Sequence, residues 1–226
     1  MSRLGIVFLT FFAIILAGFL AWLGLITLPA NLLGWFLLLV GGAYAIGVPV
    51  VFWLRRRRFW ETLADGKTLQ EESGDHSFWG MTLGMVACFF LPPLEYAYLP
   101  GLLPRNGWMQ VAGLGCIGCG VLLFLWARRS LGAFYSGHVT VVEGQHLLQT
   151  GPYRLIRHPA YAGYLLMSLG IGLGYSSLSG LVAFLVVLLP GLIYRIHIED
   201  RLLFAQFGNH FLDYAARTRR LIPGIW

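Results

Sequence analysis

The chain has 226 residues, of which 58% are hydrophobic and only 12% are charged. Because soluble domains carry about 25% charged residues, this composition excludes an ordinary soluble domain and indicates an integral membrane protein. The net charge of +6 does not indicate a nucleic-acid partner, because the arginines cluster at the ends of apolar runs, where they orient membrane helices and meet anionic lipid.

The first two apolar runs predict a helical hairpin. They extend from Leu4 to Leu28 and from Leu32 to Leu54, and Pro29-Ala30-Asn31 supplies the turn between them. Four consecutive arginines, residues 55–58, follow the second run. Cytoplasmic loops of membrane proteins are enriched in arginine and lysine, so these arginines and the N-terminus are predicted to lie in the cytoplasm.

Two further spans are predicted before a long polar segment. The third, from Phe78 to Leu99, contains Pro92-Pro93 and then Glu95. The proline pair is expected to interrupt or bend the helix. A carboxylate inside a span is a functional candidate, although the place of Glu95 near the far interface favours a solvated or paired side chain. The fourth run, from Gly107 to Ala127, is rich in small residues that let helices pack closely. Residues 1–129 are therefore predicted to form an N-terminal region of four spans.

Residues 130–226 form the second predicted region. A polar cytosolic segment reaches Arg157, and residues 139–142 within it suggest a short extended piece. A fifth run from Pro159 to Tyr175 and a sixth from Leu181 to Tyr194 predict a helical hairpin, whose second helix continues into the cytosol through charged residues 195–201. The C-terminus is then cytoplasmic. The expected fold is an all-α, polytopic membrane helix bundle with about six spans and a cytosolic pocket in the C-terminal half.

Polar chemistry concentrates where the fifth run begins, at Arg157-His158-Pro159-Ala160-Tyr161. Proline is favoured at the first position of a helix, so a helix is predicted to start at Pro159, with its free N–H groups available to an anion. Arg195 and Glu199 are four residues apart and share one helix face, where they could pair with each other or line a pocket. An antiparallel hairpin would carry His158 and Tyr161 to the same depth. Such a pocket suits a water-soluble donor and a lipophilic acceptor, although snorkelling cations and a surface ion pair would explain the same residues.

Three ordered blocks of this half resemble the isoprenylcysteine carboxyl methyltransferase family and its related phospholipid methyltransferases. The blocks are Gly151 to Tyr161, then Arg195 with Glu199-Asp200, then Phe207-Gly208 followed by Tyr214. The resemblance implies a membrane enzyme that transfers a methyl group from S-adenosylmethionine to a lipophilic acceptor, most simply a carboxylate of the isoprenylcysteine type.

The resemblance also implies roles for individual residues. Arg195 would hold the acceptor carboxylate and, with Glu199, form the catalytic pair. The chain differs from the family at Asp200, where a second glutamate is usual, and at His138, where a glutamine is usual, so the roles of these two residues stay open. The implied cofactor-binding residues are Gln145, His146, Leu147, Leu148, Tyr153, His158, Pro159, Ala160, Tyr161 and Glu199.

Three alternatives stay open. An N-methyltransferase of phospholipids or other amines would need a general base, for which His158 or Glu199 is available, whereas an ionised carboxylate acceptor needs none. A membrane reductase with a nicotinamide cofactor is the second alternative, although this sequence contains no glycine-rich fingerprint to support it. A non-enzymatic membrane subunit would use the hairpin end only as a structural contact. The histidines and cysteines lack metal-ligand spacing, so no metal is expected, and the sequence does not indicate an oligomeric state.

Overall fold

A computed structural model describes residues 3–64, 77–132 and 147–226. In these ranges the chain is helical apart from loops and one isolated β-bridge between Ile156 and Arg219, which confirms the predicted all-α class. The first four helices are α1 (Arg3–Thr27), α2 (Leu33–Ala64), α3 (Ser77–Tyr98) and α4 (Gly107–Leu131). These helices coincide with the four predicted apolar runs, except that α2 continues past Leu54 to Ala64. Helix α3 continues through its proline pair and is not interrupted there.

The second half begins with a short 3-10 turn, η2 (Gly151–Arg154), and α5 (Pro159–Gly174). The return helix starts as α6 (Leu178–Ala183), passes through one π-helical turn, η3 (Phe184–Leu188), and continues as α7 (Leu189–Phe207), before α8 (Asn209–Arg217) turns away. This helix begins three residues earlier than predicted, because the Ser177 side chain caps it by accepting the Gly180 N–H at 3.0 Å. It extends past the charged residues without a break, as the sequence predicts.

Several of these helices have the composition of membrane spans. Among the described residues, three helical stretches are long and apolar enough to cross a membrane. They are Trp79–Tyr98, Gly107–Leu131 and Leu178–Phe207. Shorter apolar helices cover Ile14–Thr27 and Leu33–Gly47. The chain is therefore an integral, multi-pass membrane protein.

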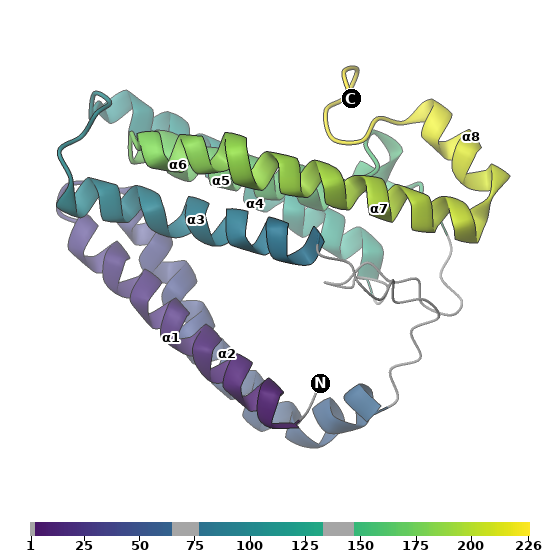
Figure 1. Ribbon diagram of the computed structural model, residues 1–226, viewed down its shortest axis with the longest axis horizontal. Helices are drawn as coiled ribbons and strands as arrows, with labels where there is room; N and C mark the ends of the chain where they lie inside the picture. The colour runs from purple at the N-terminus through teal and green to yellow at the C-terminus, as the bar shows by residue number, and fades with distance from the viewer. Residues whose placement is uncertain (1–2, 65–76, 133–146) are drawn as a thin grey trace.

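Helices α4 and α5 pack along each other through glycines (Figure 1). A Cβ atom added to Gly113 would lie 2.6 Å from the Gly170 carbonyl oxygen, and one added to Gly120 would lie 2.7 Å from the Gly163 carbonyl oxygen. The two backbones thus touch along one face, as small residues at a helix interface allow. This contact places the start of α5 beside the C-terminal half of α4.

The α1–α2 hairpin leaves the other helices at an angle and meets them near its turn (Figure 1). There Leu33 and Leu37 join a buried cluster with Ile171 of α5. Buried polar contacts reinforce this junction: the Thr27 and Tyr175 hydroxyls are 2.9 Å apart, and Asn31 Nδ2 donates to the Gly174 carbonyl at 2.9 Å. The hairpin is therefore anchored at the end of the bundle that lies far from the start of α5.

Candidate active site

The loop that leads into α5 is held by the chain's last segment. The N–H of Arg157 donates to the Arg219 carbonyl at 2.7 Å, and the N–H of His158 donates to the Arg220 carbonyl at 3.0 Å. In return, the Arg219 N–H donates to the Leu155 carbonyl at 3.3 Å. Residues 155–158 and 219–220 thus form a short parallel pairing, the single β-bridge in the described part of the chain. This pairing fixes the backbone immediately before Pro159, the first residue of α5.

The His158 side chain lies between α5 and α7 and is only 4% exposed. Its Nε2 atom is 2.9 Å from Asp200 Oδ1, and its Nδ1 atom is 3.7 Å from Glu199 Oε2. The imidazole also stacks on the Tyr161 ring, with 5.7 Å between ring centroids and an interplanar angle of 17°. His158 is thus surrounded by the two carboxylates of α7 and one aromatic face of α5.

Tyr161 connects this group to Arg195 on α7. The Nε–H of Arg195 donates to the Tyr161 hydroxyl at 2.9 Å, and Arg195 is 2% exposed. The structure therefore brings His158, Tyr161, Arg195 and Glu199 together at one end of the α5–α7 pair, which is the juxtaposition that the hairpin topology predicts. We call these four residues the hairpin cluster.

The Asp200 carboxylate lies close to three basic side chains, those of His158, Arg157 and Arg220. Its Oδ1 atom faces His158 and lies 3.6 Å from Arg157 Nε, while its Oδ2 atom accepts the Nε–H of Arg220 at 2.8 Å. Arg157 in turn donates from Nη1 to the Thr218 carbonyl at 2.8 Å. The sequence leaves the role of Asp200 open and assigns none to Arg220, because nothing local in it indicates that the tail folds back onto α7.

The structure describes only some of the other predicted site residues. Pro159 is buried and Ala160 half-buried in the first turn of α5, while Leu147 and Leu148 lie half-buried ahead of η2. Tyr153 is buried in η2, and its carbonyl accepts the Tyr214 hydroxyl at 2.7 Å. Gln145, His146, His138 and the predicted extended residues 139–142 lie outside the described residues.

One atom of the hairpin cluster, Glu199 Oε2, is suited to bind a ligand. Glu199 Oε2 is buried and has no hydrogen-bond partner among the described residues, although the Glu199 side chain as a whole is 32% exposed. A buried carboxylate oxygen without a donor is costly, and an ammonium or hydroxyl group of a ligand would supply one through a charge-assisted bond. The start of α5 adds main-chain N–H groups that a helix leaves unpaired in its first turn, and these suit a ligand's carboxylate. The residues present thus fit a zwitterionic amino-acid moiety.

Comparison with known proteins points to one enzyme family. A family model described as phospholipid methyltransferase matches residues 108–210. Over 133 residues the chain is 29% identical to protein-S-isoprenylcysteine O-methyltransferase B and 30% identical to form A of Arabidopsis thaliana, and each alignment covers 58% of this chain and 67% of the relative. The fold is similar to that of the eukaryotic intramembrane Ras methyltransferase, an isoprenylcysteine carboxyl methyltransferase, with a TM-score of 0.58 and 22% identity over 92% of this chain and 74% of that one.

Proposed function

The chain belongs to the isoprenylcysteine O-methyltransferase family of membrane methyltransferases, and we propose that it moves a methyl group from S-adenosylmethionine to the carboxylate of an isoprenylcysteine-type acceptor. The observation that carries this proposal is the hairpin cluster. It combines a buried carboxylate oxygen, Glu199 Oε2, with a buried guanidinium, Arg195, at one end of apolar helices. In the part of the chain that the structure describes, no group donates a hydrogen bond to this oxygen. A polar donor and a lipophilic acceptor can both reach such a position.

We propose that His158, Pro159, Ala160, Tyr161 and Glu199 hold the methyl donor. Glu199 Oε2 would accept a hydrogen bond from its ammonium or ribose hydroxyls, and the start of α5 would face its carboxylate. S-adenosylmethionine supplies a methyl group that is already activated on a sulfonium. The residues proposed to cover the adenosine are Gln145, His146, Leu147, Leu148 and Tyr153.

Arg195 is proposed to hold the acceptor. A guanidinium has five N–H donors in one plane, and the bond from its Nε to Tyr161 fixes the orientation of that plane. The group can then bind a carboxylate with defined geometry. A carboxylate is ionised at neutral pH, so the chain needs no general base and contributes chiefly by alignment, which is worth about 7–11 kcal/mol in favourable cases.

The proposed catalytic region is residues 130–226, beside an N-terminal four-span region of residues 1–129. Every member of the hairpin cluster lies in the second region. This boundary divides functions rather than packing units, because α4 packs along α5. We further propose that both termini and the site face the cytoplasm, since the arginine clusters 55–58, 128–129 and 217–220 follow the positive-inside rule only in that orientation.

The test of the donor site is calorimetric titration of the purified protein with S-adenosylhomocysteine. We expect both site variants to abolish saturable binding. His158→Ala removes a ring that is proposed to contact the donor, and Glu199→Ala removes the carboxylate that is proposed to bind its ammonium or ribose hydroxyls. The matched controls are His197→Ala and Asp213→Ala, which remove a histidine and a carboxylate from exposed positions on α7 and α8. Unchanged binding in both site variants would overturn the assignment.

The test of the acceptor site is the Arg195→Ala variant. We expect it to retain S-adenosylhomocysteine binding and to lose methyl transfer, because its proposed partner is the acceptor carboxylate. Full transfer activity in this variant would remove Arg195 from the mechanism.

A phospholipid amine is the second candidate acceptor, because the family model that matches residues 108–210 is that of phospholipid methyltransferases. Parallel assays with N-acetyl-S-farnesylcysteine and phosphatidylethanolamine separate the two. Transfer to the first alone supports the proposal. Transfer to the amine alone would replace the carboxylate acceptor with an amine. The rate of methyl transfer should then fall at lower pH, where the amine is protonated.

A further inference from the structure

We propose that Arg220 is a positioning residue of this site and that it acts on His158 through Asp200. The proposal rests on the proposed function, in which His158 holds the methyl donor. It concerns two residues to which neither the sequence analysis nor the proposed function assigns a role.

The three side chains form a continuous hydrogen-bonded chain. Arg220 Nε donates to Asp200 Oδ2 at 2.8 Å, and Asp200 Oδ1 lies 2.9 Å from His158 Nε2. An ionised carboxylate can only accept hydrogen bonds, so Nε2 of His158 is the nitrogen that donates. The other ring nitrogen, Nδ1, faces Glu199 and lies 3.7 Å from its Oε2 atom. Asp200 thus determines both the orientation of the ring and which of its two nitrogens carries the proton when the imidazole is neutral.

Arg220 in turn determines the orientation of Asp200. Each carboxylate oxygen has its own near partner, His158 on one side and Arg220 on the other, so the plane of the group is fixed. Without Arg220, the remaining cation beside Asp200 is Arg157, whose Nε lies 3.6 Å from the oxygen that already serves His158. The carboxylate could then rotate towards Arg157 and release the imidazole. Asp200 is only 8% exposed, so water can replace the lost partner only in part.

The segment that carries Arg220 is itself anchored to the same loop. The Arg220 carbonyl accepts the His158 N–H at 3.0 Å, so one residue of the tail contacts the main chain of His158 and, through Asp200, its side chain. The next residue, Leu221, is buried in a cluster with Ile156 and Ile196. The Arg220 guanidinium lies 5.4 Å from the centre of the Trp226 ring, which restricts the rotamers from which it reaches Asp200.

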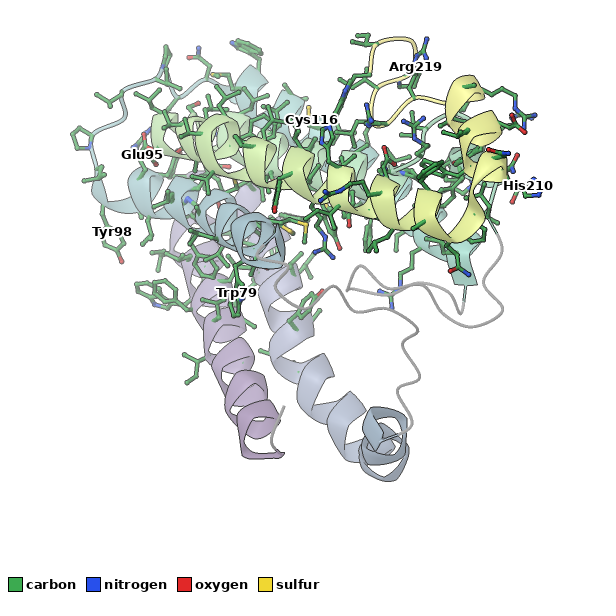
Figure 2. All side chains as sticks on the ribbon, turned by 45° about the vertical axis from the view of Figure 1, so that its right-hand side comes forward. Trp79, Glu95, Tyr98, Cys116, His210 and Arg219 are labelled. Carbon is green, nitrogen blue, oxygen red and sulfur yellow. The ribbon has the colours of Figure 1, made fainter. Side chains whose placement is uncertain are left out.

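The neighbouring arginine provides a matched control. Arg219 takes part in the same backbone pairing, but its side chain is exposed (Figure 2). Arg219→Gln and Arg220→Gln therefore remove the same charge from adjacent positions and leave the main-chain bonds possible. Only the second change removes a partner of Asp200.

The experiment combines a histidine signal with an affinity. Protein labelled with ¹⁵N-histidine in detergent micelles gives ring-nitrogen resonances that report the tautomer, and His158→Gln identifies those of His158. In Arg220→Gln we expect the His158 resonances to move towards a mixture of tautomers. We also expect S-adenosylhomocysteine to bind about tenfold more weakly, by analogy with metal sites that lose a residue orienting a metal-binding histidine. Arg220→Lys is expected to restore most of both signals, and Arg219→Gln to leave both unchanged.

Two results would overturn the proposal: unchanged His158 resonances in Arg220→Gln, or equal effects of Arg219→Gln and Arg220→Gln. If Arg220→Gln does not fold, Asp200→Asn provides the same readout, because its amide can donate to His158 and should favour the opposite tautomer. The histidine spectrum requires no cofactor. A wild-type protein that binds no S-adenosylhomocysteine would therefore refute the proposed function while the spectrum still decides whether Arg220 positions His158.

Discussion

Replacement of Glu95 by glutamine is expected to destabilise the protein and to leave donor binding intact. Glu95 is 6% exposed on α3, and Figure 2 shows it at the opposite end of the bundle from His210 of α8. A carboxylate within a span is a functional candidate by default. Here, however, its acceptor capacity is used by the protein: Oε2 accepts from the Ser177 and Ser179 hydroxyls at 2.6 and 2.5 Å and from the Ser179 N–H at 2.9 Å, and Oε1 accepts from the Leu178 N–H at 3.2 Å.

The magnitude follows from these four bonds. Glutamine has the same shape, but one acceptor oxygen becomes an amide that donates, so in either orientation it faces at least one of the donors at the start of α6. The better orientation leaves the Leu178 N–H without an acceptor, at a cost of about 1–3 kcal/mol, and turns three charge-assisted bonds into weaker neutral ones. A total of about 3 kcal/mol is reasonable, which corresponds to a Tm lower by about 6–12 °C for a chain of this length.

A buried thiol on the same helix provides the assay. Cys88 is fully buried, so a thiol-reactive dye reports its exposure when the protein unfolds in detergent, provided that Cys116 and Cys119 are first replaced by alanine. Ser179→Ala in this background is the matched control: it removes one of the four bonds and should cost about 1 kcal/mol. A Tm for Glu95→Gln within 2 °C of the parent would refute the capping role. Loss of S-adenosylhomocysteine binding well below its Tm would instead make Glu95 a functional carboxylate.

Two further changes test the packing that supports the site. Gly120→Leu should lower the Tm strongly and disturb the start of α5, because its Cβ would lie 2.7 Å from the Gly163 carbonyl oxygen, whereas Gly118→Leu, with nothing within 4 Å, should have little effect in the same dye assay. Tyr214→Phe should cost about 1–2 kcal/mol, because the Tyr153 carbonyl loses its donor. Burial raises the pKa of the Tyr214 hydroxyl from 10.0 to about 12, so the stability that its bond adds is complete below pH 10 and is lost as the pH rises towards 12. The difference in Tm between Tyr214→Phe and the parent should therefore be the same at pH 6 and pH 9.

Helix boundaries were predictable where the sequence itself contains the stop signal. The third predicted span, Phe78 to Leu99, differs by one residue at each end from α3, because Pro100 and Gly101 end it locally. The start of α6 was wrong by three residues because its cap depends on Ser177 together with Glu95, a contact across 82 residues in the chain. The angle at which the α1–α2 hairpin leaves the bundle depends on contacts around its turn, to which no local pattern points.

The same distinction applies to the site. An antiparallel helical hairpin is sufficient to predict His158 and Tyr161 opposite Arg195 and Glu199, because side chains three or four residues apart share a helix face. Arg220 depends on a reversal of the chain at Gly208, whose φ of +53° separates α7 from α8. A basic tail after a membrane helix is common at membrane surfaces, so the composition of this tail does not by itself indicate an internal ion pair between Arg220 and Asp200.

The adjacent carboxylates of α7 show how stability and binding can be divided on one helix. Successive residues are about 100° apart around a helix axis, so Glu199 and Asp200 face different partners. A buried charge costs several kcal/mol unless it is paired, and Asp200 has His158, Arg157 and Arg220 around it. Glu199 Oε2 accepts no hydrogen bond from the described residues and lies 3.7 Å from His158 Nδ1. The cost of burying a charge is thus offset at Asp200, which orients His158. It is not offset at Glu199 Oε2, the oxygen that we propose binds the donor. This difference is expected of a pre-organised binding site.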